Sequence, residues 1–328
     1  MFRRTILSFL LFASISIDGR GTRPANDTLR QALVAKHLPL AGAKLPNLDK
    51  NITSGAEFDD TNQFVIAYYV DDGSGLLNPP IFLDRYDWKR AVWTSAVLHD
   101  AKTKLDDMEI DCFGSILSIK AMGTRLFMDT HINPSAGCLL VLARDFQMEV
   151  GLYGWLVGYL DDDTLIYHRS QMHFAPVHPA EIALYDLRAK RDVTIFPPRK
   201  PSVIRQSRTA QLTEFYKANE TWCRKNDDPC APEDFDSSLQ GPVATNHADS
   251  AVAFLISYEQ IQLVQGDMQK PSGPKDVLYV YRGVKDEAKM EYREMLLEDA
   301  RVRFGTSQLP DLVQPEILQK IFAAASAN

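Results

Sequence analysis

Residues 161–198 read DDDTLIYHRSQMHFAPVHPAEIALYDLRAKRDVTIFPP. Three runs rich in β-branched and aromatic residues, at 164–170, 181–187 and 192–198, are separated by acidic, proline-containing and basic segments. Such residues favour strands, and turn signals about every 8 to 12 residues are typical of antiparallel all-β proteins. The stretch therefore predicts three antiparallel strands.

The same pattern extends along most of the chain. Further strands are predicted at 64–70, 80–86, 91–98, 115–122, 125–132, 137–145, 148–160, 251–264 and 276–284. Gly, Asn, Pro and Asp clusters separate these runs, as expected for hairpin turns. The sequence thus predicts an antiparallel sandwich, barrel or propeller.

The phrases DDDTLIYH and PAEIALYDLRAKRDVTIFP, with a strand unit that recurs roughly every 40 residues, resemble the inner hairpin of WD-repeat propellers. The dipeptide Tyr185-Asp186 ends the outer strand of that hairpin, although the family's Gly-His and Trp-Asp signatures are absent. The resemblance covers residues 60–198 and 251–284. It implies an all-β, propeller-like fold of four or five small antiparallel blades, and a binding scaffold as often as an enzyme. A pair of β-sandwiches is the alternative fold.

The N-terminus has the pattern of a secretory signal peptide. Arg3 and Arg4 precede an apolar run from Ile6 to Ile17, which ends at Asp18. We therefore expect residues 1–21 to be a signal peptide and the protein to be exported, to the periplasm or outside the cell. A buried N-terminal helix is the alternative. No later apolar run approaches ~20 residues, so no membrane span is expected in the mature chain.

Helices are expected outside the strand-rich part. Residues 22–60 are predicted to be a helix, at 27–37, followed by a linker. Residues 61–285 would form the propeller-like domain, interrupted by an insertion at 199–249 with an amphipathic helix and a polar loop from 223 to 250. Residues 286–328 would be a helical tail, with helices at 287–304 and 315–325.

The four cysteines are even in number, as disulfide pairing in an exported protein requires. Cys223 and Cys230 flank a turn-rich loop and are the best pair, which leaves Cys112 with Cys138. Four cysteines allow three connectivities, so the other two remain open.

Composition argues against nucleic acid as a partner. The chain has 328 residues, 45% hydrophobic and 24% charged, with a net charge of −7 and no basic run. Binding a polyanion needs a concentrated basic surface.

A histidine series follows the first predicted strand of the opening stretch. His168, His173 and His178 are five residues apart, and Glu181 comes next. Residues five apart face different ways on a strand or a helix, so a metal site would need loop 170–180 to bring them together. His131 would be a fourth partner. The competing interpretation is that all are ordinary loop or edge histidines.

Two other groups could serve a ligand. Paired carboxylates such as Asp161–Asp163 can act in hydrolysis, but Asp is also favoured in hairpin turns, and we predict turns here. The aromatic residues around Trp155 and Tyr159 would line a ligand groove or lie in the core.

The sequence thus predicts an exported binding or scaffold protein that contacts a protein or a small-molecule ligand and has no cofactor. A hydrolase or metalloenzyme that uses the His168, His173 and His178 loop is the alternative. A carbohydrate-binding module that depends on Trp155 is a third interpretation.

Overall fold

The computed structural model describes residues 51–71, 80–90, 92–105, 108–133, 136–170, 180–198, 237–258 and 276–323, together with Lys217 and Thr221. Several predictions fall outside these residues: the signal peptide at 1–21, the helix at 27–37, His173, His178, Cys223 and Cys230.

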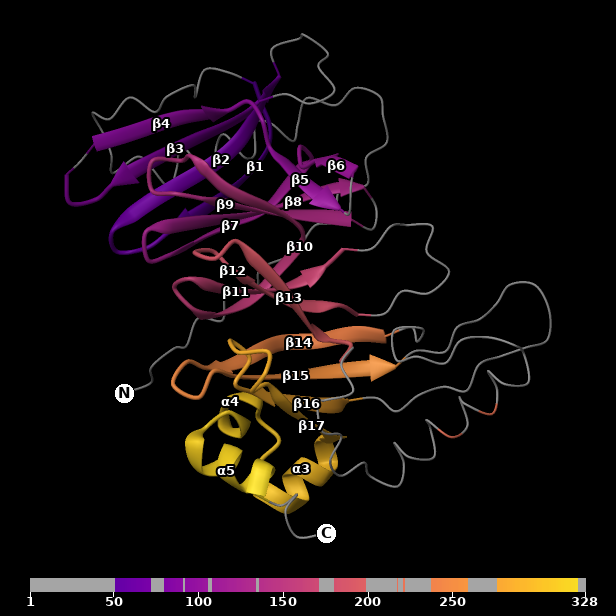
Figure 1. Ribbon diagram of the computed structural model, residues 1–328. Helices are drawn as coiled ribbons and strands as arrows, with labels where there is room; N and C mark the ends of the chain where they lie inside the picture. Colours follow the sequence, from indigo (N-terminus) through magenta and orange to yellow (C-terminus); the bar gives the residue numbers. More distant parts are fainter. Residues whose placement is uncertain are drawn as a thin grey trace, which may run out of the picture.

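Strands dominate the structure, and every sheet is an antiparallel meander (Figure 1). The first sheet has the order β1-β2-β3-β4, and a separate hairpin, β5-β6, follows it. Their bounds are β1 Asn51–Asp59, β2 Gln63–Asp71, β3 Ile81–Asp87, β4 Val92–Leu98, β5 Lys102–Leu105 and β6 Met108–Asp111.

Seven strands form the second sheet, in the order β13-β12-β11-β10-β9-β8-β7. They are β7 Ser115–Met122, β8 Arg125–Asn133, β9 Ala136–Leu142, β10 Met148–Asp161, β11 Thr164–Arg169, β12 Ile182–Asp186 and β13 Arg191–Phe196. The long strand β10 pairs with β9 up to Tyr153 and with β11 from Gly154 onward. It is therefore shared by two four-stranded halves.

The last sheet has the order β14-β15-β16-β17, and helices follow it. The elements are β14 Ser237–Asn246, β15 Ala251–Tyr258, β16 Val277–Arg282, β17 Glu291–Leu296, α3 Leu297–Phe304, α4 Leu309–Leu312 and α5 Pro315–Ala323. Among the described residues, no helix is long and apolar enough to cross a membrane.

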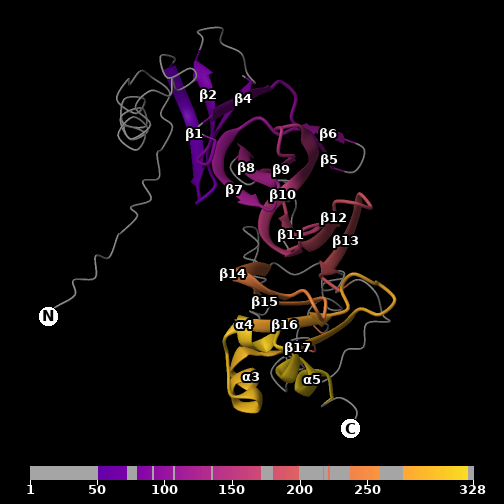
Figure 2. The same ribbon diagram turned by 90° about the vertical axis from the view of Figure 1, so that its left-hand side faces the viewer.

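The sheets stack face to face, in the order of the chain (Figures 1 and 2). Strand β2 shows how one sheet packs on the next. Its Val65 and Ala67 pack against β7, β8 and β9, whereas its Phe64 and Ile66 lie on the opposite face of the first sheet. A strand that is buried on both faces needs apolar residues at nearly every position. The predicted strands were recognisable for this reason.

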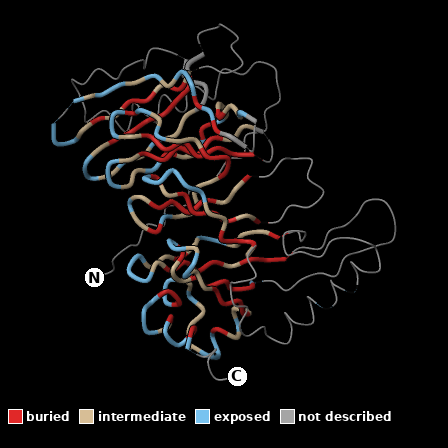
Figure 3. The backbone as a smooth tube through the Cα atoms, viewed as in Figure 1, coloured by how far each residue is buried: buried red, intermediate tan, exposed pale blue. Residues whose placement is uncertain are grey.

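The alternation continues through the stack. Residues of β8 and β9, such as Phe127 and Leu139, meet Leu165 and Ala183 of the half formed by β11 and β12. The opposite face of that half packs against Phe254 and other aromatic residues of β15 and β16. The outer face of the last sheet is covered by α3, α4 and α5. Figure 3 shows the buried centre of each layer.

The all-β expectation is confirmed, but a closed propeller is not found among the described residues. A propeller arranges its blades radially around a channel. Here the four-stranded units follow one another in a row, two of them share β10, and helices cover the last one. The packing is that of an open stack.

Three expected segments differ in secondary structure. Residues 51–59, placed in the linker, form β1, and the loop predicted at 223–250 contains β14. The helix predicted at 287–304 begins only at Leu297, because residues 291–296 pair with β16 along their whole length. Tertiary strand pairing overrides the helix propensity of a sequence such as EYREML.

Candidate functional site

Three described residues of the predicted site, His131, Trp155 and His168, lie on β8, β10 and β11 of the second sheet. Trp155 of β10 is directly opposite His168 of β11. The His131 ring, from β8, stacks on the Trp155 indole with the ring centroids 6.0 Å apart. The fold therefore brings His131 and His168 to the same tryptophan, which spacing along the sequence did not reveal.

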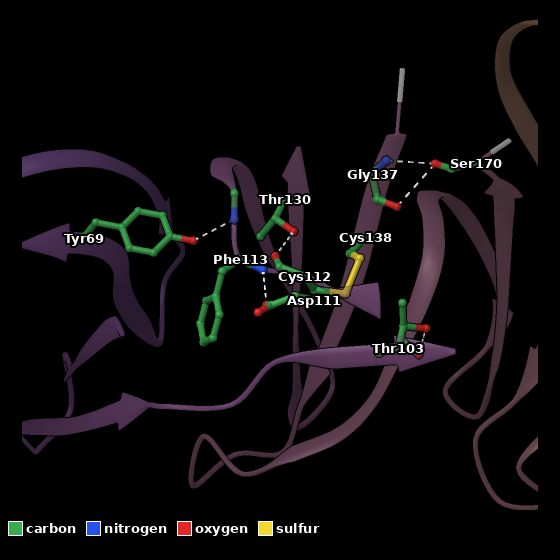
Figure 4. Close-up of a disulfide and its surroundings, with 11 residues drawn as sticks. Tyr69, Thr103, Asp111, Cys112, Phe113, Thr130, Gly137, Cys138 and Ser170 are labelled. Carbon is green, nitrogen blue, oxygen red and sulfur yellow. Dashed lines mark hydrogen bonds between the residues drawn. A yellow bond between two sulfur atoms is a disulfide. The ribbon is translucent and has the colours of Figure 1, made fainter. Parts of the chain in front are cut away.

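A glycine makes room for this indole. A Cβ atom at Gly137, the residue opposite His131 on β9, would overlap the Trp155 ring. Ser170 fixes the strand there: its hydroxyl accepts the Gly137 N–H at 2.9 Å (Figure 4). Trp155 is thus held as a packing residue between two strands, and it is only half-buried.

His168 has the properties of a structural histidine. Its Nε2 atom is buried and has no hydrogen-bond partner among the described residues. Burial lowers the pKa of the imidazole, and the negative charge of Glu181 opposes that shift only in part. The ring is therefore uncharged at neutral pH.

Glu181 is held by its own neighbours. Arg169 Nη1 donates to Glu181 Oε1 at 2.5 Å, and the Thr194 hydroxyl donates to the same oxygen at 3.0 Å. Arg169 also bridges to Asp192, which accepts the Tyr167 hydroxyl at 2.6 Å. These contacts tie β11, β12 and β13 together at one end of the sheet, which is a structural role.

A metal centre is not formed by the described residues, which contain no group of three histidine, cysteine or acidic side chains able to hold an ion. His173 and His178 lie outside the described residues. The interpretation of the histidine series as a metal site therefore stays a prediction.

The expected Cys112–Cys138 disulfide is confirmed (Figure 4). Both cysteines are buried, and the Thr130 hydroxyl donates to the Cys112 carbonyl at 2.7 Å. Tyr69 reaches the same region from the first sheet, where its hydroxyl accepts the Gly114 N–H at 3.1 Å. The disulfide therefore fixes the segment before β7 to β9. The Cys223–Cys230 pair lies outside the described residues.

A cleft of about 790 Å³ lies at the opposite end of the strands. Here tight hairpin turns of the second sheet meet those of the last sheet, β14–β17, which is called the third sheet below. Its apolar residues are Met122, Leu160, Leu184, Val193 and Val284. Its polar and charged residues are Tyr159, Asp161, Asp162, Asp163, Thr164, Asp186, Arg188, Arg191, Thr245, His247 and Lys285. The cleft thus combines an apolar part with charges of both signs.

Asp161 connects the two sheets across this cleft. Its Oδ2 atom forms an ion pair with the Lys285 ammonium and lies 3.3 Å from His247 Nδ1. Partial burial opposes ionisation of Asp161, but Lys285 and the Asp163 N–H outweigh it and hold the pKa below its usual value. The carboxylate stays charged at neutral pH and is unsuited to act as a general acid.

The sequence matches no known family model and no curated protein.

The other charges of the cleft differ in whether they are already paired. Asp163 is bound by Arg125 at 3.2 Å and by Arg188 at 2.6 Å. Arg191, by contrast, forms no ion pair within the described part of the chain, and Tyr159 is 46% exposed. Arg191 and Tyr159 are therefore available to a ligand.

Sequence reasoning found only part of this cleft. The predicted turn at Asp161–Asp163 is confirmed, since Asp161 Oδ1 accepts the Asp163 N–H at 3.0 Å. His247 and Lys285 were not identified, because they belong to hairpins more than 80 residues further along the chain. The sequence does show charged residues at successive hairpin turns. They indicate a shared site only when the order of the sheets is known, because that order decides which turns lie side by side.

Proposed function

We propose that this chain is an exported binding protein, and that the cleft between the second and third sheets holds its ligand. The observation that carries the proposal is the cleft itself: an open hollow of about 790 Å³ with an apolar part, an exposed tyrosine and an available arginine. Ligand sites of small molecules have this size and this mixture of surfaces. A buried disulfide supports export, because such bonds persist in oxidising compartments.

The charges of the cleft favour a ligand that carries both signs. Asp162 and Asp186 lie in the same cleft as Arg191, so a simple anion or a simple cation would meet repulsion from part of the lining. Asp186 Oδ1 already accepts two backbone N–H groups of its turn, which keeps this carboxylate in place. A short peptide with free termini would satisfy both signs and lay its side chains on the apolar part.

Calorimetric titration with short peptides tests the proposal. Peptides with free termini should bind, and the same peptides with acetylated and amidated ends should bind at least about tenfold more weakly, because charge-assisted contacts are lost. Arg191→Ala and Tyr159→Ala should each raise the Kd of the free peptide by a similar factor.

Lys320→Ala, on the exposed surface of α5, is the matched control and should leave the Kd unchanged. Equal binding of free and blocked peptides, or of all three variants, would contradict the proposed site. A complete absence of binding across peptides of varied side chains would contradict the ligand class.

A further inference from the structure

The outer edge of the first sheet is unusual for an exposed strand. β4 reads VWTSAVL, without a charged residue or a proline, and no described strand pairs with its outer edge. Val92 and Val97 are 47% and 41% exposed. Its pairing with β3 runs from Val92 to Leu98 without a bulge. Natural edge strands normally carry charges, prolines or bulges that prevent pairing with another chain, and β4 has none of them.

The sequence of β4 is complementary to itself in the antiparallel direction. With Ser95 at the centre, Trp93 would lie opposite Val97, and Thr94 opposite Ala96. Aromatic residues opposite β-branched residues make favourable cross-strand pairs, and no like charges would face each other within the strand.

The residues that flank β4 are also complementary in charge. The basic pair Lys89-Arg90 precedes the strand, and Asp100 follows it. Arg90 belongs to the turn before β4. With the twofold axis at Ser95, this turn of one copy would come to the same end of the paired strands as Asp100 of the other copy, and the axis would create this contact twice. The Arg90 side chain is 75% exposed, and its ion pair with Asp87 is long, at 3.9 Å. Both partners are therefore on the surface and able to meet.

We propose that a second copy of this chain pairs with β4, antiparallel and centred on Ser95, to form a continuous eight-stranded sheet in a homodimer. The contact uses the same surface of both copies, so it closes after two chains and does not extend into a fibre. The cleft is lined by residues of the second and last sheets and by none of the first sheet. Figure 1 shows β4 in the first sheet, away from the last sheet, so the cleft stays open in this dimer. The proposal is therefore independent of the proposed ligand.

Sedimentation velocity of the purified full chain over a concentration series tests the dimer. Twice the monomer mass is expected at micromolar concentration. Arg90→Glu and Asp100→Lys should each raise the dimer dissociation constant by tenfold or more, because each places like charges opposite one another twice. The double variant Arg90→Glu/Asp100→Lys restores opposite charges and should return the constant to within threefold of the original.

Lys320→Glu, a charge reversal on α5, is the matched control and should leave the dimer intact. Circular dichroism and the thermal midpoint show that each variant is folded. A specific dimer is expected to have a dissociation constant below roughly 100 μM. A protein that stays monomeric at that concentration overturns the proposal. So does a dimer whose dissociation constant responds to neither single reversal, since another surface would then hold it.

Discussion

Individual buried carboxylates show how this stack accommodates polar groups. Asp84 of β3 is 2% exposed, and its Oδ2 accepts the Tyr68 hydroxyl at 2.5 Å. Burial raises its pKa, although hydrogen bonds from Ser95 and Tyr68 oppose the shift. Asp129 of β8 is similar: burial raises its pKa, while it accepts the Ser118 hydroxyl at 2.7 Å. Such groups make the stability of the fold dependent on pH.

The sign of that dependence follows from the raised pKa of Asp84. The folded state binds the proton more tightly than the unfolded state, so the stability linked to Asp84 is fully present below the ordinary pKa of 3.8 and is lost as the pH rises through the folded value. We predict that the free energy of unfolding of the wild type, minus that of Asp84→Asn, falls between pH 4 and pH 8. Urea unfolding across this range measures it.

Asp87→Asn is the control of opposite sign. The Arg90 and Lys89 N–H groups lower the pKa of Asp87, so its contribution is present above pH 3.8 and is lost as the pH falls below that value. An Asp84 difference that stays flat with pH would show that the carboxyl titrates alike in both states.

Among the elements, β10 determines how the second sheet is divided. It changes partner from β9 to β11 at Gly154, where a Cβ atom would overlap the His168 carbonyl oxygen and lie 2.9 Å from Tyr167 Cδ2. The backbone of β11 therefore approaches β10 more closely at Gly154 than it could if any other residue stood there. The two halves then fold over the core that contains Phe127 and Leu165.

Gly154→Ala should lower the free energy of unfolding by about 1–3 kcal/mol, because the added methyl group meets backbone atoms that cannot move aside. Urea unfolding of the purified variant checks this value. Gly123→Asn is the matched control: nothing lies within 4 Å of its Cβ atom, and Asn tolerates the positive φ of that turn. Equal losses in the two variants would contradict the close approach at Gly154.

The elements also show where sequence patterns succeed. β2, β9 and β15 were predicted because both of their faces are buried, which demands apolar residues throughout. β14 and β17 were missed because their own sequences, SSLQGPVATN and EYREML, lack a strand pattern: the first is polar and contains Gly and Pro, and the second is charged and favours a helix. In β17, for example, Glu291 forms an ion pair with Arg282 Nη2 at 2.5 Å, and Tyr292 lies opposite Tyr281. Pairing with the neighbouring strand β16 therefore holds β17 in an extended conformation that its own residue pattern does not indicate.

At the scale of the whole molecule, each layer contacts chiefly its neighbours in the stack. A stack that does not close needs its apolar outer faces covered, as in repeat proteins with terminal caps. α3, α4 and α5 provide that cover for β14–β17. Phe322 of α5 is buried there, and the guanidinium groups of Arg282 and Arg293 lie 4.2 and 4.7 Å from its ring centroid.

Phe322→Ala should cost about 3–5 kcal/mol of local stability, because it removes a buried ring from the cap. Hydrogen exchange should show faster exchange in β15 and β16, with little change in β2 and β3. Val302→Ala, at a side chain that is 78% exposed on α3, should leave exchange unaltered. A uniform loss of protection in all sheets would instead mean that the stack unfolds as one unit.

The sequence by itself determined the all-β class and most of the strands, because these depend on local alternation. It favoured the Cys112–Cys138 pair but left two other connectivities open, and the structure decided between them. The sequence also suggested His131, Trp155 and His168, without their arrangement. Only the tertiary structure decided that the sheets form an open row, that Glu181 is held by Arg169, and that Asp161 meets Lys285 across a cleft. Asp161 and Lys285 are far apart in the chain, and a linear pattern of polar residues does not state which turns will meet.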